Sequence, residues 1–161
     1  MAEFSGEPNG AGRRFAVVAS RFNQQITEKL AEGAIDALTK HGASFDDVDM
    51  VWVPGAWELT AATRRLLASD RYDAIIAVGA VIRGDTPHFD FVAGEASRGL
   101  ADASAEFDRP IGFGLLTCDT VEQAEARAGG EHGNKGWDAA LAALEMADLF
   151  DRLEAGGDDE D

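Results

Sequence analysis

The sequence predicts an α/β protein, a three-layer α/β/α sandwich around a four-stranded parallel sheet. Short apolar segments alternate with longer segments whose apolar residues recur at the spacing of one helix face. The longest apolar segment, residues 74–82, is interrupted only by Gly79, so a strand here is apolar on both faces. Strands of this kind are typical of parallel sheets that helices cover on both sides.

The expected elements follow one another in alternation. The four strands are expected at FAVVAS (15–20), MVWV (50–53), DAIIAVGAVI (73–82) and PIGFGLLT (110–117). Four helices are indicated by these groups: Ile26, Leu30, Ala34 and Leu38; Leu59, Ala62 and Leu66; Phe89, Val92, Ala96, Leu100 and Ala103; Trp137, Leu141, Leu144 and Asp148. A short helix is expected at 120–128, between the last two of these. We interpret the helix stripes as core.

The 161 residues indicate one domain, large enough to bury a core. We expect a flexible N-terminal segment at 1–13, a single α/β domain at 14–155 and an acidic flexible tail at 156–161. A segment that resembles a signal peptide is absent from the sequence, and no apolar run approaches the ~20 residues of a membrane helix. Cys118 is the one cysteine, which excludes an internal disulfide and favours a reducing, cytoplasmic location.

The net charge of −16 argues against binding of nucleic acid or an anionic membrane through a broad basic face. We expect strong self-repulsion at low salt, relieved by screening. Two interpretations stay open. The protein works in a salty cytoplasm, or it is an ordinary acidic protein.

The turns after the four strands are the candidate walls of one ligand pocket, because open α/β sheets bind ligands beyond the carboxyl ends of their strands. These turns are SRFNQQ, PGAWE, RGDTPH and TCDT. Each also has a structural explanation. Phe22 could cover the sheet end, Glu58 suits the first turn of a helix, and Asp85 or Thr86 could cap a helix with Pro87 at its first position.

The capping explanation leaves His88 and Arg83 unexplained, although a lone histidine at a helix start is more often structural than catalytic. The three histidines lack metal-ligand spacing, and no dinucleotide fingerprint, P-loop or nucleophile elbow occurs. The residues alone therefore predict a small α/β enzyme or ligand binder, with an anion site near Thr86.

Six motifs taken together resemble the lumazine synthase family of riboflavin biosynthesis, over residues from about 15 to about 150. They are SRFN, VPGAWEL, GAVIRGDTPHFDFV, FGLLT, EQAEARAG and GNKGWDAALAALEMA, in the family's order and spacing. The resemblance implies a flavodoxin-like fold. It also implies condensation of 5-amino-6-(ribitylamino)uracil with 3,4-dihydroxy-2-butanone 4-phosphate to 6,7-dimethyl-8-ribityllumazine, with loss of phosphate and water and no metal or organic cofactor.

The resemblance also implies which residues contact the first substrate, the ribitylaminouracil. Phe22 would stack on the pyrimidine ring. The segment of Ala56, Trp57 and Glu58 would hold the ribityl chain, with Glu58 accepting from its hydroxyls. The pyrimidine edge would bind the backbone of three residues of the third strand: Ala80, Val81 and Ile82.

For the second substrate, the resemblance implies that amides near Asp85 and Thr86, with the Thr86 hydroxyl, take the phosphate at a helix N-terminus. Arg127 would supply the countercharge. His88 would be the proton shuttle, since an imidazole with an ordinary pKa of ~6.5 can both give and take protons near neutral pH.

The family builds its pocket between neighbouring subunits of a pentamer, so Phe113, Arg127 and Lys135 would come from the neighbour. A homo-oligomer is therefore expected, either a pentamer or a 60-subunit capsid of pentamers. The short loop between Arg127 and Asn134 resembles that of capsid-forming members. Three residues depart from the pattern or sit uneasily in it: Glu131 where relatives often have a basic residue, Trp57 where phenylalanine is usual, and Asp85 close to a phosphate.

The sequence also allows two rival functions to be compared with this one. A riboflavin synthase of the same superfamily would dismutate two lumazines, but its pattern lacks the RGDTPHFD turn. A non-catalytic flavin-binding shell protein would not need His88, Arg127 and Thr86 together, so their joint presence favours catalysis.

Overall fold

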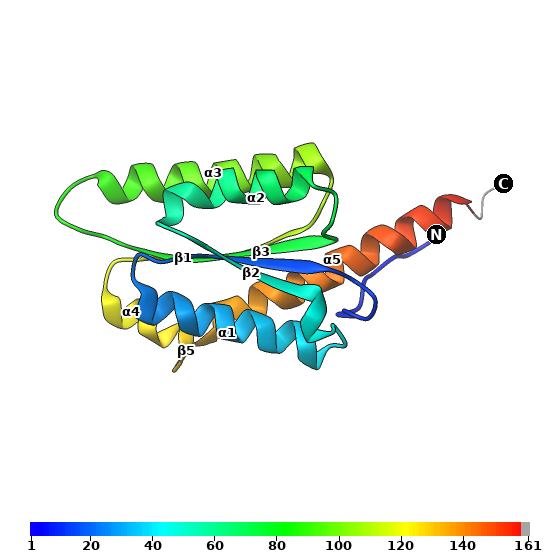
Figure 1. Cartoon of the computed structure of the whole chain (residues 1–161), viewed down its shortest axis with the longest axis horizontal. Coiled ribbons are helices and arrows are strands. Elements are labelled where there is room, and N and C mark those ends of the chain that lie inside the picture. The colour runs from blue at the N-terminus through cyan, green and yellow to red at the C-terminus, as the bar shows by residue number, and fades with distance from the viewer. Residues whose placement is uncertain (159–161) are drawn as a thin grey trace.

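The computed structural model describes residues 1–158, and it confirms the α/β prediction (Figure 1). Its sheet consists of β1 (Phe15–Ser20), β2 (Val48–Val53), β3 (Ala74–Ile82) and β4 (Ile111–Cys118). The strands are parallel and lie in the order β2-β1-β3-β4. β2 starts earlier than its apolar run predicts, because this edge strand accommodates Asp49, whose carboxylate accepts a 2.6 Å hydrogen bond from the Tyr72 hydroxyl.

The five expected helices are all present. α1 (Gln24–Lys40), α4 (Val121–Ala126) and α5 (Lys135–Asp158) cover one face of the sheet, and α2 (Leu59–Ala68) and α3 (His88–Phe107) cover the other (Figure 1). The sequence pattern did not indicate the 3₁₀ turns η1 (Phe45–Asp47) and η2 (Ala56–Glu58), or the antiparallel pair β5 (Ala128–Gly130) and β6 (Gly133–Asn134). Elements of two or three residues are too short to show a period.

Two apolar cores lie on opposite sides of the sheet, as the two-sided apolar strand predicts. Ile76 packs with Leu30 and Leu144 on the side of α1 and α5. Its neighbour Ile75 packs with Leu59 on the side of α2 and α3. The sheet is thus buried on both faces, and its strand ends are left to carry polar groups.

The N-terminal segment lies beside α5 (Figure 1). The Glu7 N–H donates to Asp148 over 2.9 Å, and the Arg13 guanidinium pairs with Asp148 and Asp151. Of the acidic tail expected at 156–161, residues 156–158 belong to α5, and the rest lie outside the described residues. The domain boundaries themselves stay a prediction.

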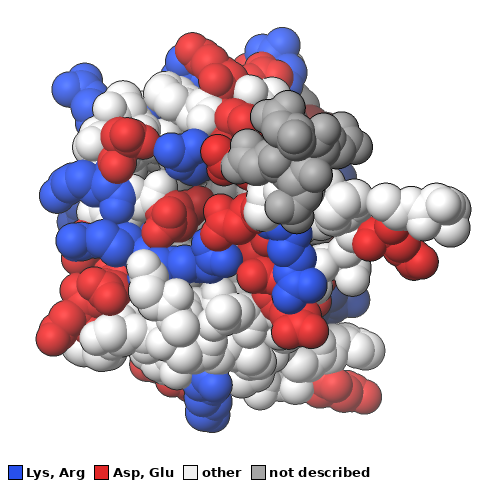
Figure 2. Space-filling view, turned by 90° about the vertical axis from the view of Figure 1, so that its right-hand side faces the viewer, with Lys and Arg blue, Asp and Glu red and all other residues white. Residues whose placement is uncertain are grey.

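The surface mixes charges of both signs. Figure 2 shows acidic and basic side chains interleaved on the face turned toward the end of α5. Among residues 1–158, none of the helices combines the length and the apolar character needed to cross a membrane.

Candidate functional site

The strand order opens a crevice between β1 and β3. The connection after β1 leaves along one face of the sheet through α1, and the connection into β3 arrives along the other through α2. Ligands of open α/β sheets bind at such a switch point, beyond the carboxyl ends of the strands. A cavity of about 820 Å³ lies there, within the usual size range for a small-molecule site.

The structure brings most of the predicted site residues to this cavity. Its lining includes Phe22, Ala56, Trp57, Glu58, Ala80, Val81, Ile82, Thr86 and His88. They come from the turns after β1, β2 and β3, from the end of β3 itself and from the first residue of α3. Asp85 is exposed on the third of these turns but does not line the cavity, whereas its neighbours Gly84 and Thr86 do.

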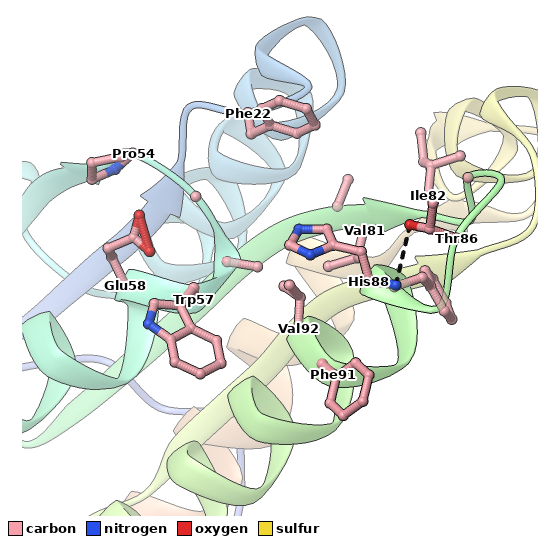
Figure 3. A pocket seen from close by; sticks show the side chains of 15 residues that line it. Phe22, Pro54, Trp57, Glu58, Val81, Ile82, Thr86, His88, Phe91 and Val92 are labelled. Carbon is pink, nitrogen blue, oxygen red and sulfur yellow. Dashed lines mark hydrogen bonds between the residues drawn. The ribbon is translucent and has the colours of Figure 1, made fainter.

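The turn after β1 places Phe22 at the cavity (Figure 3). The Arg21 and Phe22 N–H groups donate to the carbonyls of Val53 and Pro54, over 2.8 and 3.0 Å. These bonds fix the turn against the end of β2. The Phe22 side chain is 72% exposed, so its aromatic face is free to stack on a flat ligand.

The turn after β2 supplies the side of the cavity where Figure 3 draws Trp57 and Glu58. Here the short turn η2 closes through a 3.2 Å hydrogen bond from the Glu58 N–H to the Gly55 carbonyl. Ala56 is buried, while Trp57 is 60% exposed. A carboxylate beside an accessible aromatic ring suits a ligand that carries both hydroxyls and apolar surface.

The turn after β3 delivers Thr86 and His88, and the His88 ring points into the cavity (Figure 3). The His88 N–H donates to the Thr86 Oγ1 over 3.4 Å. The N-cap of α3 is Pro87, which lies just before the helix instead of at its first position, so neither Asp85 nor Thr86 occupies the N-cap position. The Thr86 hydroxyl can still donate its own hydrogen to an anion, which the start of α3 also favours.

Sequence reasoning missed several lining residues, and one of them carried a usable signal. Phe91 is 68% exposed and lines the cavity. It follows His88 by three positions, so both lie on one face of α3. The others are Pro54, Gly55, Gly84, Phe89 and Val92. The apolar pattern predicts Phe89 and Val92 as part of the core stripe of this helix.

Apart from Asp85, three predicted site residues do not line the cavity. Phe113 is 42% exposed on the edge strand β4. Arg127 directly follows α4, and its Nη1 donates to the Gln123 carbonyl over 2.9 Å. Lys135 begins α5, and its N–H donates to the Arg127 carbonyl over 2.8 Å. Arg127 and Lys135 thus form a second group, apart from the cavity.

Arg127 also acts on its surroundings electrostatically. Burial raises the pKa of the Cys118 thiol, and the positive charge of Arg127 opposes that rise.

Among residues 1–158, no group of three or more His, Cys, Asp or Glu side chains is arranged so that it could hold a metal ion.

Comparisons with known proteins agree with this geometry. The family model for 6,7-dimethyl-8-ribityllumazine synthase matches residues 12–151. The chain is 69% identical to a protein of that name from Gemmatimonas aurantiaca, over 100% of this chain and 99% of the relative. Its namesakes from Aquifex aeolicus and Chlorobaculum tepidum are each 51% identical, over 95% of this chain and 99% of the relative. The chain therefore belongs to the 6,7-dimethyl-8-ribityllumazine synthase family.

Proposed function

We propose that this protein condenses 5-amino-6-(ribitylamino)uracil with 3,4-dihydroxy-2-butanone 4-phosphate to 6,7-dimethyl-8-ribityllumazine, without a metal or organic cofactor. The observation that carries the proposal is the cavity at the switch point. Phe22, Thr86 and His88 reach it from different turns, in a chain that belongs to the family of that name. Phosphate and water are the other products.

The pyrimidine substrate fits the part of the cavity nearer β1 and β2. Phe22 stacks on its ring, and Glu58 accepts hydrogen bonds from the ribityl hydroxyls. Backbone groups of Ala80, Val81 and Ile82, at the end of β3, bind the pyrimidine edge. The phosphate substrate fits the other part, where the Thr86 hydroxyl and the amides at the start of α3 meet the phosphate.

His88 moves the protons. The substrate amine attacks the ketone, the carbinolamine loses water, and phosphate is eliminated. Each of these steps needs a group that gives or takes a proton, and the imidazole points into the cavity where both substrates meet. Holding the two substrates together supplies much of the remaining rate.

A neighbouring subunit completes the pocket. Phe113, Arg127 and Lys135 lie away from the cavity of their own chain, and this separation supports their serving the cavity of a second copy. Arg127 then faces the phosphate as its countercharge. The assembly is a pentamer or a 60-subunit capsid of pentamers. It works in a reducing cytoplasm, where the buried Cys118 stays a free thiol.

Turnover of the two substrates by the purified protein tests the proposal. We expect the lumazine chromophore and one phosphate per lumazine only when both substrates are present, with no change after treatment with a chelator. Riboflavin formed from added lumazine would instead indicate a riboflavin synthase. Flavin binding without turnover would indicate a shell protein, and either outcome would contradict the proposal.

A further inference from the structure

The β3–α3 turn, residues 83–87, carries Thr86 and leads directly to His88, yet few contacts hold it. All five of its residues are exposed, and space around Gly84 is open enough that an added Cβ would meet nothing within 4 Å. The weak bond between Thr86 and the His88 N–H joins the turn only to the first residue of α3, two positions further along the chain. Something outside the turn must therefore set its position.

Arg83 makes that external connection. Its N–H donates to the Cys118 carbonyl over 2.8 Å, and its Nε donates to the Asp119 carboxylate over 2.9 Å. Its Nη1 reaches Asp90 on α3 at 3.5 Å, and the guanidinium lies over the Phe89 ring, 4.4 Å from the ring centre. The hydrogen bond to Asp119 raises the pKa of Arg83 above its ordinary value.

The connection continues from Asp119 toward Arg127. The Asp119 N–H donates to the Gln123 side chain over 2.8 Å, and Gln123 completes the capping box with Thr120 at the start of α4. The Gln123 carbonyl in turn accepts from Arg127. A chain of direct contacts therefore runs from the start of α3, beside His88, to Arg127.

These contacts are well placed for positioning and poorly placed for stability. The side chains of Arg83, Asp90 and Asp119 are 47%, 62% and 65% exposed. Ion pairs so exposed contribute little to folding stability. A forked guanidinium that bridges two carboxylates and covers a ring nevertheless fixes the direction of the segments that it joins.

We propose that Arg83 is a positioning residue, which fixes the turn of Thr86 and His88 against the β4–α4 turn that leads to Arg127. The inference rests on the proposed function, because its main readout is that reaction. The turn that carries Phe22 is held separately, by its hydrogen bonds to the end of β2. Loss of Arg83 should therefore disturb the phosphate half of the cavity and spare the pyrimidine half.

The test compares Arg83→Met and Arg83→Lys with Arg98→Met. Arg98 pairs with Glu95 on α3 at 2.7 Å, does not line the cavity, and gives the same change in charge as Arg83→Met. For Arg83→Met we expect kcat to fall about tenfold and the KM of the phosphate substrate to rise, since small misplacements are costly. The KM of the pyrimidine substrate and the Tm should match those of Arg98→Met.

Arg83→Lys keeps the charge but loses the fork, so its kcat should stay several-fold below that of the wild type. Wild-type kcat in Arg83→Lys would overturn the proposal. A lower Tm with an equal rise in both KM values would also overturn it, because that pattern indicates general structural damage.

Amide hydrogen exchange separates this inference from the proposed function. We expect the amides of 84–86 and of His88 to exchange faster in Arg83→Met than in the wild type, and to stay unchanged in Arg98→Met. Unchanged exchange of these amides in Arg83→Met would reject the positioning role of Arg83, whether or not the protein catalyses the proposed reaction. A wild-type protein that turns over neither substrate would reject the function and leave the exchange result to decide on Arg83.

Discussion

The side-chain amide of Asn23 donates a 3.0 Å hydrogen bond to the backbone carbonyl of Ala80. The bond joins the turn that carries Phe22 to the end of β3, so two walls of the cavity are tied together. Asn23 has a φ of 62°, in the left-handed region that asparagine and glycine adopt more readily than other residues. One residue therefore both turns the chain after β1 and fixes that turn beside β3.

Substitutions of Asn23 separate its two roles. Asn23→Gly keeps the left-handed backbone and loses the hydrogen bond, which should lower the free energy of unfolding by about 1 kcal/mol. Asn23→Ala also strains the backbone and should cost about 1–2 kcal/mol more. Denaturant unfolding measures both. Equal stability of the two variants would contradict the strain argument.

The hydrogen bond from Asn23 to Ala80 could not be predicted from the sequence, although the elements that it joins could be. Apolar patterning predicts the four strands and the four longer helices, because burial on one or both faces dictates that pattern. The rule for strand ends located the turns of Phe22, Glu58 and His88. Which turns touch depends on the strand order, and no local pattern encodes that β1 lies between β2 and β3.

The polar links at the site could not be predicted for the same reason. Arg83 stood out in the sequence as unexplained, but its partner Asp119 follows another strand. The two become neighbours only because β3 and β4 pair along their length. Arg127 and Lys135 are likewise joined through the short β5–β6 pair, which is too brief to give a sequence signal.

Replacement of His88 by alanine should lower kcat about 10²-fold, within the usual range for loss of a general acid–base group. Product should still form, because the residues that position the substrates remain. His132→Ala is the matched control, since His132 is exposed and does not line the cavity. Steady-state kinetics with both substrates measure the effect. An unchanged kcat in His88→Ala would remove His88 from the mechanism.

Asp148 should make stability depend on pH through the N-terminal segment. The Glu7 N–H, followed by Arg152 and Arg13, lowers the pKa of Asp148 below its ordinary value of 3.8. A carboxyl group whose pKa is lower in the folded state stabilises the fold when the pH is above its pKa in the unfolded state. This stabilisation is lost as the pH falls through its pKa in the folded state. Asp148→Asn should therefore cost about 2 kcal/mol at neutral pH, and the difference should shrink below a pH of about 4.

The control for that experiment is Asp151→Asn. Asp151 pairs with the same Arg13, but its side chain is 63% exposed, against 12% for Asp148. Exposed ion pairs contribute little, so this variant should stay close to the wild type. Thermal unfolding between pH 3 and 8 compares the three proteins. If the difference in stability between Asp148→Asn and the wild type stayed constant over that pH range, the titration argument would be refuted.

Salt should stabilise the protein and its assembly. Thirty acidic residues face fourteen basic ones, and their repulsion is strongest when screening is weak. The interleaved charges in Figure 2 reduce this repulsion locally, but they cannot cancel a net charge of −16. The thermal midpoint of unfolding and the assembly size from light scattering, each measured at ~0.1 M and ~2 M salt, test this prediction. Identical values at the two concentrations would contradict the interpretation that the protein suits high salt.

Mixed assemblies should show whether His88 and Arg127 meet across subunits. His88→Ala and Arg127→Ala should each be poorly active alone. When the two are unfolded and reassembled in equal amounts, neighbours around the ring are random. A pocket is intact when its cavity comes from an Arg127→Ala chain and its completing residues come from a His88→Ala chain. About one half times one half, or roughly a quarter, of the pockets should then recover.

A pocket contained within a single chain predicts no recovery, because every chain carries one of the two lesions. In one chain the His88 side chain points into the cavity, whereas Arg127 lies outside its lining and is held against α4. That separation is why we expect recovery. Mass spectrometry must first verify that the chains have mixed. Activity of verified mixtures no greater than the mean of the two single variants would reject the shared pocket, and with it the placement of Phe113 and Lys135 in a neighbour's cavity.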